Sequence, residues 1–317
     1  MRRWLCAALL ALAPLPAPAQ EPAPSSTPSP EQGATPPPLR VGVGVDLVSV
    51  TAVVQDKQGR FVSGLGEKDV EVFEDGVRQD VTFFREARGG EHVPLSLVLV
   101  LDTSGSMSRT LQFLQEAALN LLQKMEDKDT ALIVSFNDSV KASSEFISDY
   151  DRLEQYVEAL QAWGGTSLYD AVHYGLNRVR DQPGRKAVIV FSDGADTTSS
   201  LKEQEVTDYA KAVEATVYSV GFKGEQGFFA RGPRGFLRGI ARETGGTFYA
   251  PDKVGELIKT FSAISDELQH HYLLAYTPKR SPDGTFRSIE VRVKRPDTEV
   301  RVRKGYFSVK RKAGGAR

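Results

Sequence analysis

Cysteine is almost absent from this sequence, and histidine is scarce. One Cys and four His among 317 residues exclude a disulfide framework and a zinc ribbon built from cysteines. Basic residues number 40 and acidic residues 41, for a net charge of −1, which excludes a strongly basic chain that tracks nucleic acid through bulk electrostatics. The remaining composition is ordinary for a globular protein, and the length suits about two domains of ~100–200 residues each.

Long apolar runs are also missing beyond the N-terminus, where the first residues are typical of a secretory signal peptide. Arg2 and Arg3 precede the short apolar stretch 4–12, and the small residues of 17–19 form a cleavage site. The apolar stretch is too short to span a bilayer. We therefore expect residues 1–19 to be removed together with the only cysteine, leaving a periplasmic or secreted protein with no membrane span. The alternative is a buried N-terminal helix.

The rest of the chain changes character several times. Proline, serine and threonine dominate residues 20–38, which predicts an extended linker. Residues 39–92 contain short valine-rich runs separated by glycine turns, a pattern of about four antiparallel strands. Residues 93–271 alternate apolar strands with amphipathic helices. Strands return in 272–310, and 311–317 is a short basic tail.

The alternating middle segment predicts an α/β domain with a doubly wound, mostly parallel, Rossmann-like sheet. Its first strand, Leu95–Leu101, is apolar on both faces, as expected for a central parallel strand. The last helix, near Val254–His270, is followed by strands expected at Tyr272–Tyr276, Arg287–Lys294 and Val300–Phe307.

The two flanking β segments have opposite charge balances. Residues 39–92 carry 7 basic and 10 acidic residues, whereas 270–317 carry 13 basic and 4 acidic residues. Neither segment alone is an obvious domain. We therefore expect the α/β domain to be inserted in a split antiparallel β-sandwich domain, with two separate β appendages as the alternative.

Polar clusters follow the strands of the α/β segment. They are Asp102–Ser106, Gly164–Ser167 and Ser192–Gly194. Each cluster alone is also typical of a helix cap. Ligands of open α/β sheets bind at the carboxyl ends of the strands, so together the three clusters predict a binding site there. Their donors are hydroxyls and carboxylates, which favour a hard cation, Mg²⁺ or Mn²⁺.

Within these clusters the pattern Asp102-x-Ser104-x-Ser106, with Thr166 and Asp193, resembles the metal-ion-dependent adhesion site of von Willebrand factor A domains. The resemblance covers about residues 93–270. It implies the von Willebrand factor A fold, and it implies that these five residues hold the cation directly or through water. It also implies that a protein partner supplies an Asp or Glu to the metal.

The leading hypothesis is a secreted, non-enzymatic binding module with a role in cell adhesion or assembly. A scaffold whose metal site is not essential is the first alternative. A metal-assisted hydrolase with Ser104 or Ser106 as nucleophile is the second, although no G-x-S-x-G elbow is present. Nucleic acid is not an expected partner, and the sequence leaves the oligomeric state open.

Overall fold

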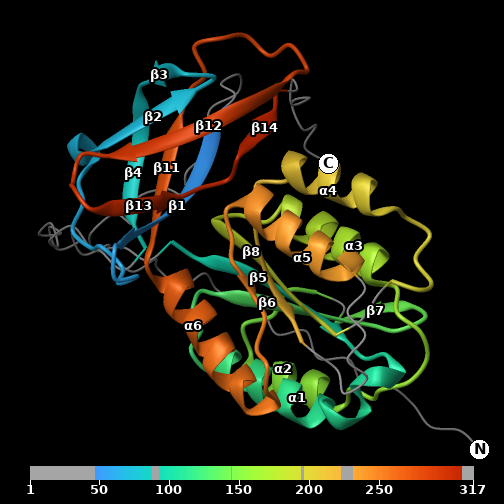
Figure 1. The fold of residues 1–317 in the computed structure, drawn as a ribbon. Coiled ribbons are helices and arrows are strands. Elements are labelled where there is room, and N and C mark those ends of the chain that lie inside the picture. The colour runs from blue at the N-terminus through green and yellow to red at the C-terminus, as the bar shows by residue number, and fades with distance from the viewer. Residues whose placement is uncertain (1–46, 88–92, 144, 194–195, 223–230, 309–317) are drawn as a thin grey trace, which may run out of the picture. The chain divides into compact units, whose positions relative to one another are not determined.

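The described part of the computed structural model comprises residues 47–87, 93–143, 145–193, 196–222 and 231–308 (Figure 1). These residues belong to one compact unit, Val41–Arg317. The expected signal peptide 1–19, linker 20–38 and tail 311–317 lie outside them. Among the helices described, none has the length and apolar character needed to cross a membrane.

A six-stranded sheet with the order β10-β9-β8-β5-β6-β7 forms the centre of the α/β part. Its strands are β5 (Leu95–Asp102), β6 (Thr130–Phe136), β7 (Val140–Ala142), β8 (Arg185–Ser192), β9 (Thr216–Gly221) and β10 (Phe248–Tyr249). All neighbours pair in parallel except β6 and β7, which are antiparallel. The predicted α/β fold with a mostly parallel sheet is confirmed, with one antiparallel edge strand added.

Helices cover both faces of this sheet (Figure 1). They are α1 (Leu111–Leu122), α2 (Tyr150–Glu158), α3 (Leu168–Arg180), α4 (Glu203–Ala212), α5 (Arg231–Thr244) and α6 (Leu257–Gln269), with short 3-10 turns η1 (Glu67–Asp69), η2 (Gly105–Arg109) and η3 (Val254–Glu256). Successive side chains of β5 point to opposite faces of the sheet, so this strand contributes to the apolar core on each face. Leu97 and Leu99 join the core formed with α1, α2 and α6, whereas Val98 and Val100 join that formed with α3, α4 and α5.

Gly175 lets α3 pack closely on the central strand. A Cβ atom at this position would lie 3.0 Å from Val100 Cγ2 and 3.2 Å from Val98 Cγ1. The start of α3, and with it the loop that contains Thr166, is therefore held near β5.

The remaining strands form two antiparallel sheets. Their orders are β13-β1-β11-β4 and β14-β12-β2-β3. The strands are β1 (Val48–Asp56), β2 (Val70–Glu74), β3 (Val77–Gln79), β4 (Val81–Glu86), β11 (His271–Tyr276), β12 (Phe286–Val293), β13 (Thr298–Arg301) and β14 (Gly305–Phe307). Each sheet pairs strands that precede the α/β part with strands that follow it. For example, β1 pairs with β11 from Val48–Tyr276 to Val53–His271.

A buried polar network connects these two sheets. Glu74 of β2 forms an ion pair with Arg287 of β12 at 3.0 Å. It also accepts hydrogen bonds from the hydroxyls of Tyr276 (2.9 Å) and Tyr306 (2.8 Å). Tyr276 belongs to the other sheet, so this carboxylate links both sheets within an otherwise apolar core. Such a buried group is tolerated only because its oxygens are paired.

The expected single strand Val300–Phe307 is wrong. The chain forms β13 and β14 instead, and these strands belong to different sheets. The residues between them are held by the α/β part, because Lys304 N donates to Glu243 O (3.0 Å) and the Arg303 side chain donates to Lys211 O (2.7 Å). Contacts with distant residues therefore interrupt a segment that is strand-like in sequence.

Candidate metal centre

The candidate metal centre lies at the carboxyl ends of β5 and β8. The last residue of β5 is Asp102, and Asp193 follows the last residue of β8, Ser192. Because these strands are parallel neighbours, both ends lie at the same edge of the sheet. Ser104 and Ser106 follow in the turn that leads through η2 into α1.

Asp102 forms the buried floor of the site. Its side chain accepts hydrogen bonds from Ser104 N (2.8 Å) and from Ser192 Oγ (2.6 Å). Burial raises the pKa of Asp102 to about 6, although the hydrogen bonds from the two serines oppose this effect. The carboxylate is thus fixed in position, and its negative charge lies in a poorly solvated environment.

A chain of oxygen atoms leads from this floor to the surface. The hydroxyls of Ser104 and Ser106 are 3.0 Å apart, and Ser106 Oγ donates to Asp193 Oδ1 at 2.9 Å. Ser104 is buried, Asp193 is half-buried and Ser106 is exposed. Burial also raises the pKa of Asp193. The structure therefore brings four of the five expected residues into one hydrogen-bonded group.

Thr166 lies in the loop that precedes α3, and backbone hydrogen bonds hold this loop against the loop that follows β5. Gly105 N donates to Gly164 O at 3.0 Å, and Trp163 N donates to Thr103 O at 2.9 Å. Thr166 N in turn donates to Thr197 Oγ1 at 2.8 Å. Within the described residues, no hydrogen bond joins the Thr166 hydroxyl to the other four side chains.

Asp138 is a residue at this edge that the sequence analysis does not include. Its carboxylate accepts a hydrogen bond from Gly165 N at 2.8 Å. Gly164 has a positive φ of 75°, and a Cβ there would lie 2.2 Å from Asp138 Oδ2, so the glycine is required by both conformation and space. Asp138 follows β6 almost directly, and the strand-end rule applied to that strand would have found it.

The hydrogen bonds recorded for Asp196 go to α3 and to its own loop, and not to the candidate metal ligands. Its carboxylate accepts from Tyr169 N (3.0 Å) and from Ser199 Oγ (2.5 Å). It therefore binds the first turn of α3 and fixes the loop that follows β8.

The donor set fits a hard divalent cation. Two ligand atoms at ~2.1 Å from one ion and at a right angle lie ~3.0 Å from each other, which is close to the oxygen spacings observed here. The same atoms can therefore exchange their hydrogen bonds for metal coordination with little movement. No cluster of three or more Asp, Glu, His or Cys side chains that would hold a metal occurs in the described ranges. The five candidate ligands include only two carboxylates, so a cation there would take its other donors from hydroxyls, water or an external ligand.

Comparisons with known proteins agree with this architecture. Residues 97–195 match the family model of the von Willebrand factor type A domain. An uncharacterized protein of Synechocystis sp. is 25% identical over 212 residues, which are 61% of this chain and 48% of that protein. The chain therefore spans about half the length of this curated relative.

Two solved structures are also similar. For a von Willebrand factor type A structure from Catenulispora acidiphila, the similar region covers 84% of this chain and 63% of that chain, with a TM-score of 0.51 and 15% sequence identity. The vWF domain of the type V pili tip protein Mfa5 from Porphyromonas gingivalis matches 56% of this chain and 96% of its own, with a TM-score of 0.47 and 14% identity.

The central sheet, its two helical layers and the strand-end site define a class of α/β domains that bind ligands at the carboxyl edge of the sheet. The family match identifies residues 97–195 as a von Willebrand factor type A domain.

Proposed function

We propose that this protein is a non-enzymatic binding module that captures an acidic side chain of a protein partner through a divalent cation. The cation, Mg²⁺ or Mn²⁺, is held by Asp102, Ser104, Ser106, Thr166 and Asp193. The observation that carries this proposal is the hydrogen-bonded group of Asp102, Ser104, Ser106 and Asp193, which runs from the buried Asp102 carboxylate to the exposed Ser106 hydroxyl.

The composition of the site favours an external acidic ligand. The two carboxylates provide −2 charge, and the hydroxyls are neutral. A hard cation there supplies a positive charge at the mouth of the site and prefers six oxygen donors. The exposed position of Ser106 leaves room for a further oxygen, and a carboxylate satisfies both the charge and the donor type.

The rim of the site supports a protein partner. Trp163, beside the Gly164 turn, has 49% of its surface exposed. The Lys141 ammonium lies 5.7 Å from the centre of its ring. Exposed aromatic residues are enriched at protein interfaces, and a cation beside one suits an acidic partner. We therefore place Trp163 and Lys141 in the partner-binding surface.

The same proposal includes a domain organisation. Residues 39–92 and 272–310 form one antiparallel β-sandwich, interrupted by the type A domain in 93–271. Strand pairings between β1 and β11 and between β2 and β12 support this division, as does the shared apolar core. Together with the signal-like residues 1–19, it suits a periplasmic or secreted protein with an adhesion or assembly role.

Two neighbouring serines provide a matched test of the metal site. Ser106 and Ser108 are both exposed and both lie in η2. Ser106 belongs to the oxygen group, whereas Ser108 Oγ donates to Gly105 O at 2.7 Å. Ser106→Ala should weaken Mn²⁺ binding about 10-fold or more, whereas Ser108→Ala should leave it unchanged. Electron paramagnetic resonance measures Mn²⁺ binding, and displacement by Mg²⁺ and Zn²⁺ ranks the cations.

Capture of partners from an extract with Mg²⁺, and again with a chelator, then tests recognition. We expect an acidic protein that is lost on chelation and lost with Ser106→Ala. Equal Mn²⁺ affinity in wild type and both serine variants would reject the metal assignment. Metal binding by the wild type with chelator-insensitive partner capture would favour the scaffold alternative.

A further inference from the structure

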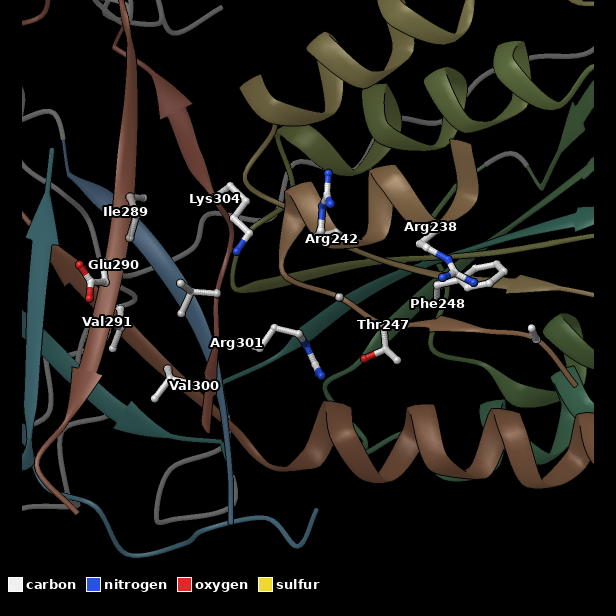
Figure 2. A pocket seen from close by; sticks show the side chains of 13 residues that line it. Arg238, Arg242, Thr247, Phe248, Ile289, Glu290, Val291, Val300, Arg301 and Lys304 are labelled. Carbon is white, nitrogen blue, oxygen red and sulfur yellow. The ribbon is translucent and has the colours of Figure 1, made fainter. Parts of the chain in front are cut away.

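A second candidate binding site lies away from the metal centre, in a groove of about 650 Å³ beside α5 (Figure 2). One wall is formed by α5 and β10, and the other by β12, β13 and the segment that leads to β14. A volume of this size is within the range of ligand pockets. None of the five proposed metal ligands lines it.

Positive charge dominates the groove. Arg238 and Arg242 project from α5, Arg301 comes from β13, and Lys304 follows β13 (Figure 2). Glu290 is the one carboxylate among the described residues that line it.

The carboxylates nearby do not neutralise all of this charge. Glu290 accepts from Arg292 Nε at 2.6 Å, and Arg301 is paired with the buried Glu267. Among the described residues, Arg242 pairs only with Glu243, at 3.5 Å and with the arginine 72% exposed, and such surface pairs contribute little to stability.

Two of the cations have no carboxylate partner among the described residues. These are Arg238 and Lys304, both exposed. Arg238 instead lies over the ring of Phe248, with its guanidinium carbon 5.1 Å from the ring centre. The groove therefore presents positive charge from both of its walls, which favours an anionic ligand.

Apolar side chains line the same space. Phe248, Val300 and Val302 are partly exposed and line it, whereas Ile289 and Val291 of β12 are each only 6% exposed because they pack in the core between the two antiparallel sheets. A small inorganic anion would leave these groups without contact. A ligand that carries both apolar groups and carboxylates matches the lining better.

An unpaired strand edge borders the groove. The strand β14 pairs with β12 only from Phe286 to Ser288, whereas β12 continues to Val293. Ile289 N then donates to Lys304 O at 3.0 Å. Because the N–H direction alternates along a strand, Val291 N–H points toward the same side, where none of the described strands pairs with it. Such edges accept an extended peptide as an additional strand.

We propose that this groove binds an extended acidic peptide segment of a protein partner, added to the edge of β12. Alternate side chains of the peptide lie on opposite faces. Apolar side chains then contact Phe248, Val300 and Val302, and carboxylates face Lys304, Arg242 and Arg238. This site is distinct from the proposed metal centre and requires no cation.

The test uses the full chain and a fluorescein-labelled peptide of three Val-Glu repeats, followed by fluorescence anisotropy. A Val-Gln peptide removes the charge, and a peptide with N-methyl groups on alternate amides removes the backbone hydrogen bonds. We expect the Val-Glu peptide to bind, and both altered peptides to bind at least tenfold more weakly. Inorganic tripolyphosphate serves as the competitor for a purely ionic site.

Charge reversal locates the site. Lys304→Glu combined with Arg242→Glu should weaken Val-Glu binding at least tenfold, whereas Lys259→Glu, an equally exposed change on α6, should not. Both positions are exposed, and circular dichroism checks that the fold is retained. Binding should persist in chelator and in Ser106→Ala.

Several outcomes overturn the proposal. They are no measurable peptide binding at millimolar concentration, equal binding of the N-methylated peptide, and displacement by tripolyphosphate at concentrations below those of the peptide. Loss of peptide binding on chelation would assign the peptide to the metal centre instead. Failure of metal binding alone, with peptide binding intact, would reject the proposed function and leave this inference standing.

Discussion

Removing Arg301 tests whether the type A domain and the antiparallel sheets are energetically connected. Its guanidinium, 31% exposed, pairs with Glu267 of α6, which is 4% exposed. Its Nε also donates to Gly245 O at 3.0 Å. In Arg301→Gln, the buried carboxylate would lose its cationic partner and keep neutral ones, such as the Thr247 hydroxyl, which donates to it at 3.2 Å. Isolating a buried charge costs about 3–5 kcal/mol, and the partial exposure of Arg301 reduces our expectation to about 2–4 kcal/mol.

The measurement is urea unfolding followed by tryptophan fluorescence and circular dichroism. Arg292→Gln is the matched control, because its ion pair with Glu290 is 57% and 54% exposed and should contribute about 0–1 kcal/mol. The double variant Arg301→Gln/Glu267→Gln should recover at least half of the loss, since no unpaired charge remains. An Arg301→Gln cost no larger than that of Arg292→Gln would refute the reasoning.

Three further outcomes are expected. Burial, aided by nearby arginines, lowers the pKa of His271 well below its usual value, so the folded state stays neutral while the unfolded state takes up a proton below about pH 6.5. The free energy of unfolding should therefore fall by up to ~1.4 kcal/mol per pH unit below that value, and urea titrations of His271→Gln should lack this part of the slope. Gly164→Ala forces a Cβ atom against Asp138 and should weaken Mn²⁺ binding several-fold. Gly184→Ala is equally strained, but its Cβ atom would meet Pro94 O, far from the proposed ligands in sequence; this variant should lower the unfolding temperature and leave Mn²⁺ binding unchanged. Residues 39–92 alone should show no cooperative thermal transition, because β1 pairs with β11 and β13; such a transition would contradict the split β domain.

The central sheet could be predicted because its signals are local. The apolar run Leu95–Leu101 requires burial on both faces, and this is where β5 lies. Chain order then places the ends of parallel strands at one edge, so Asp102 and Asp193 could be expected near each other before any contact was known. Hydroxyls at Ser104 and Ser106 follow within the same turn, which makes their proximity a local property as well.

The parts that escaped prediction depend on distant contacts. The break between β13 and β14 follows from hydrogen bonds to Glu243 and Lys211, which are remote in sequence. The role of Asp138 depends on a backbone amide 27 positions away. The ion pair between Glu267 and Arg301 likewise joins residues whose proximity no local pattern indicates. Local periodicity contains no information about such pairs.

The two proposed sites lie apart, and α6 contacts elements of both: Phe261 packs against Phe191 of β8, and Glu267 pairs with Arg301 of the groove. The metal ligands follow the carboxyl ends of β5 and β8, whereas the groove includes Gly246 and Thr247, which precede β10. The helix α6 begins after β10 and ends one residue before β11. Its last turn is held by Arg185, which donates to Leu268 O at 2.5 Å, and by the ion pair of Glu267. A coupling between cation and peptide that moved α6 would alter these contacts, and linkage requires that any coupling be equal in both directions. Because the hydrogen bond to Leu268 O and the Glu267 carboxylate are buried, and both contacts would be lost if α6 shifted, the structure favours two independent sites on a rigid junction.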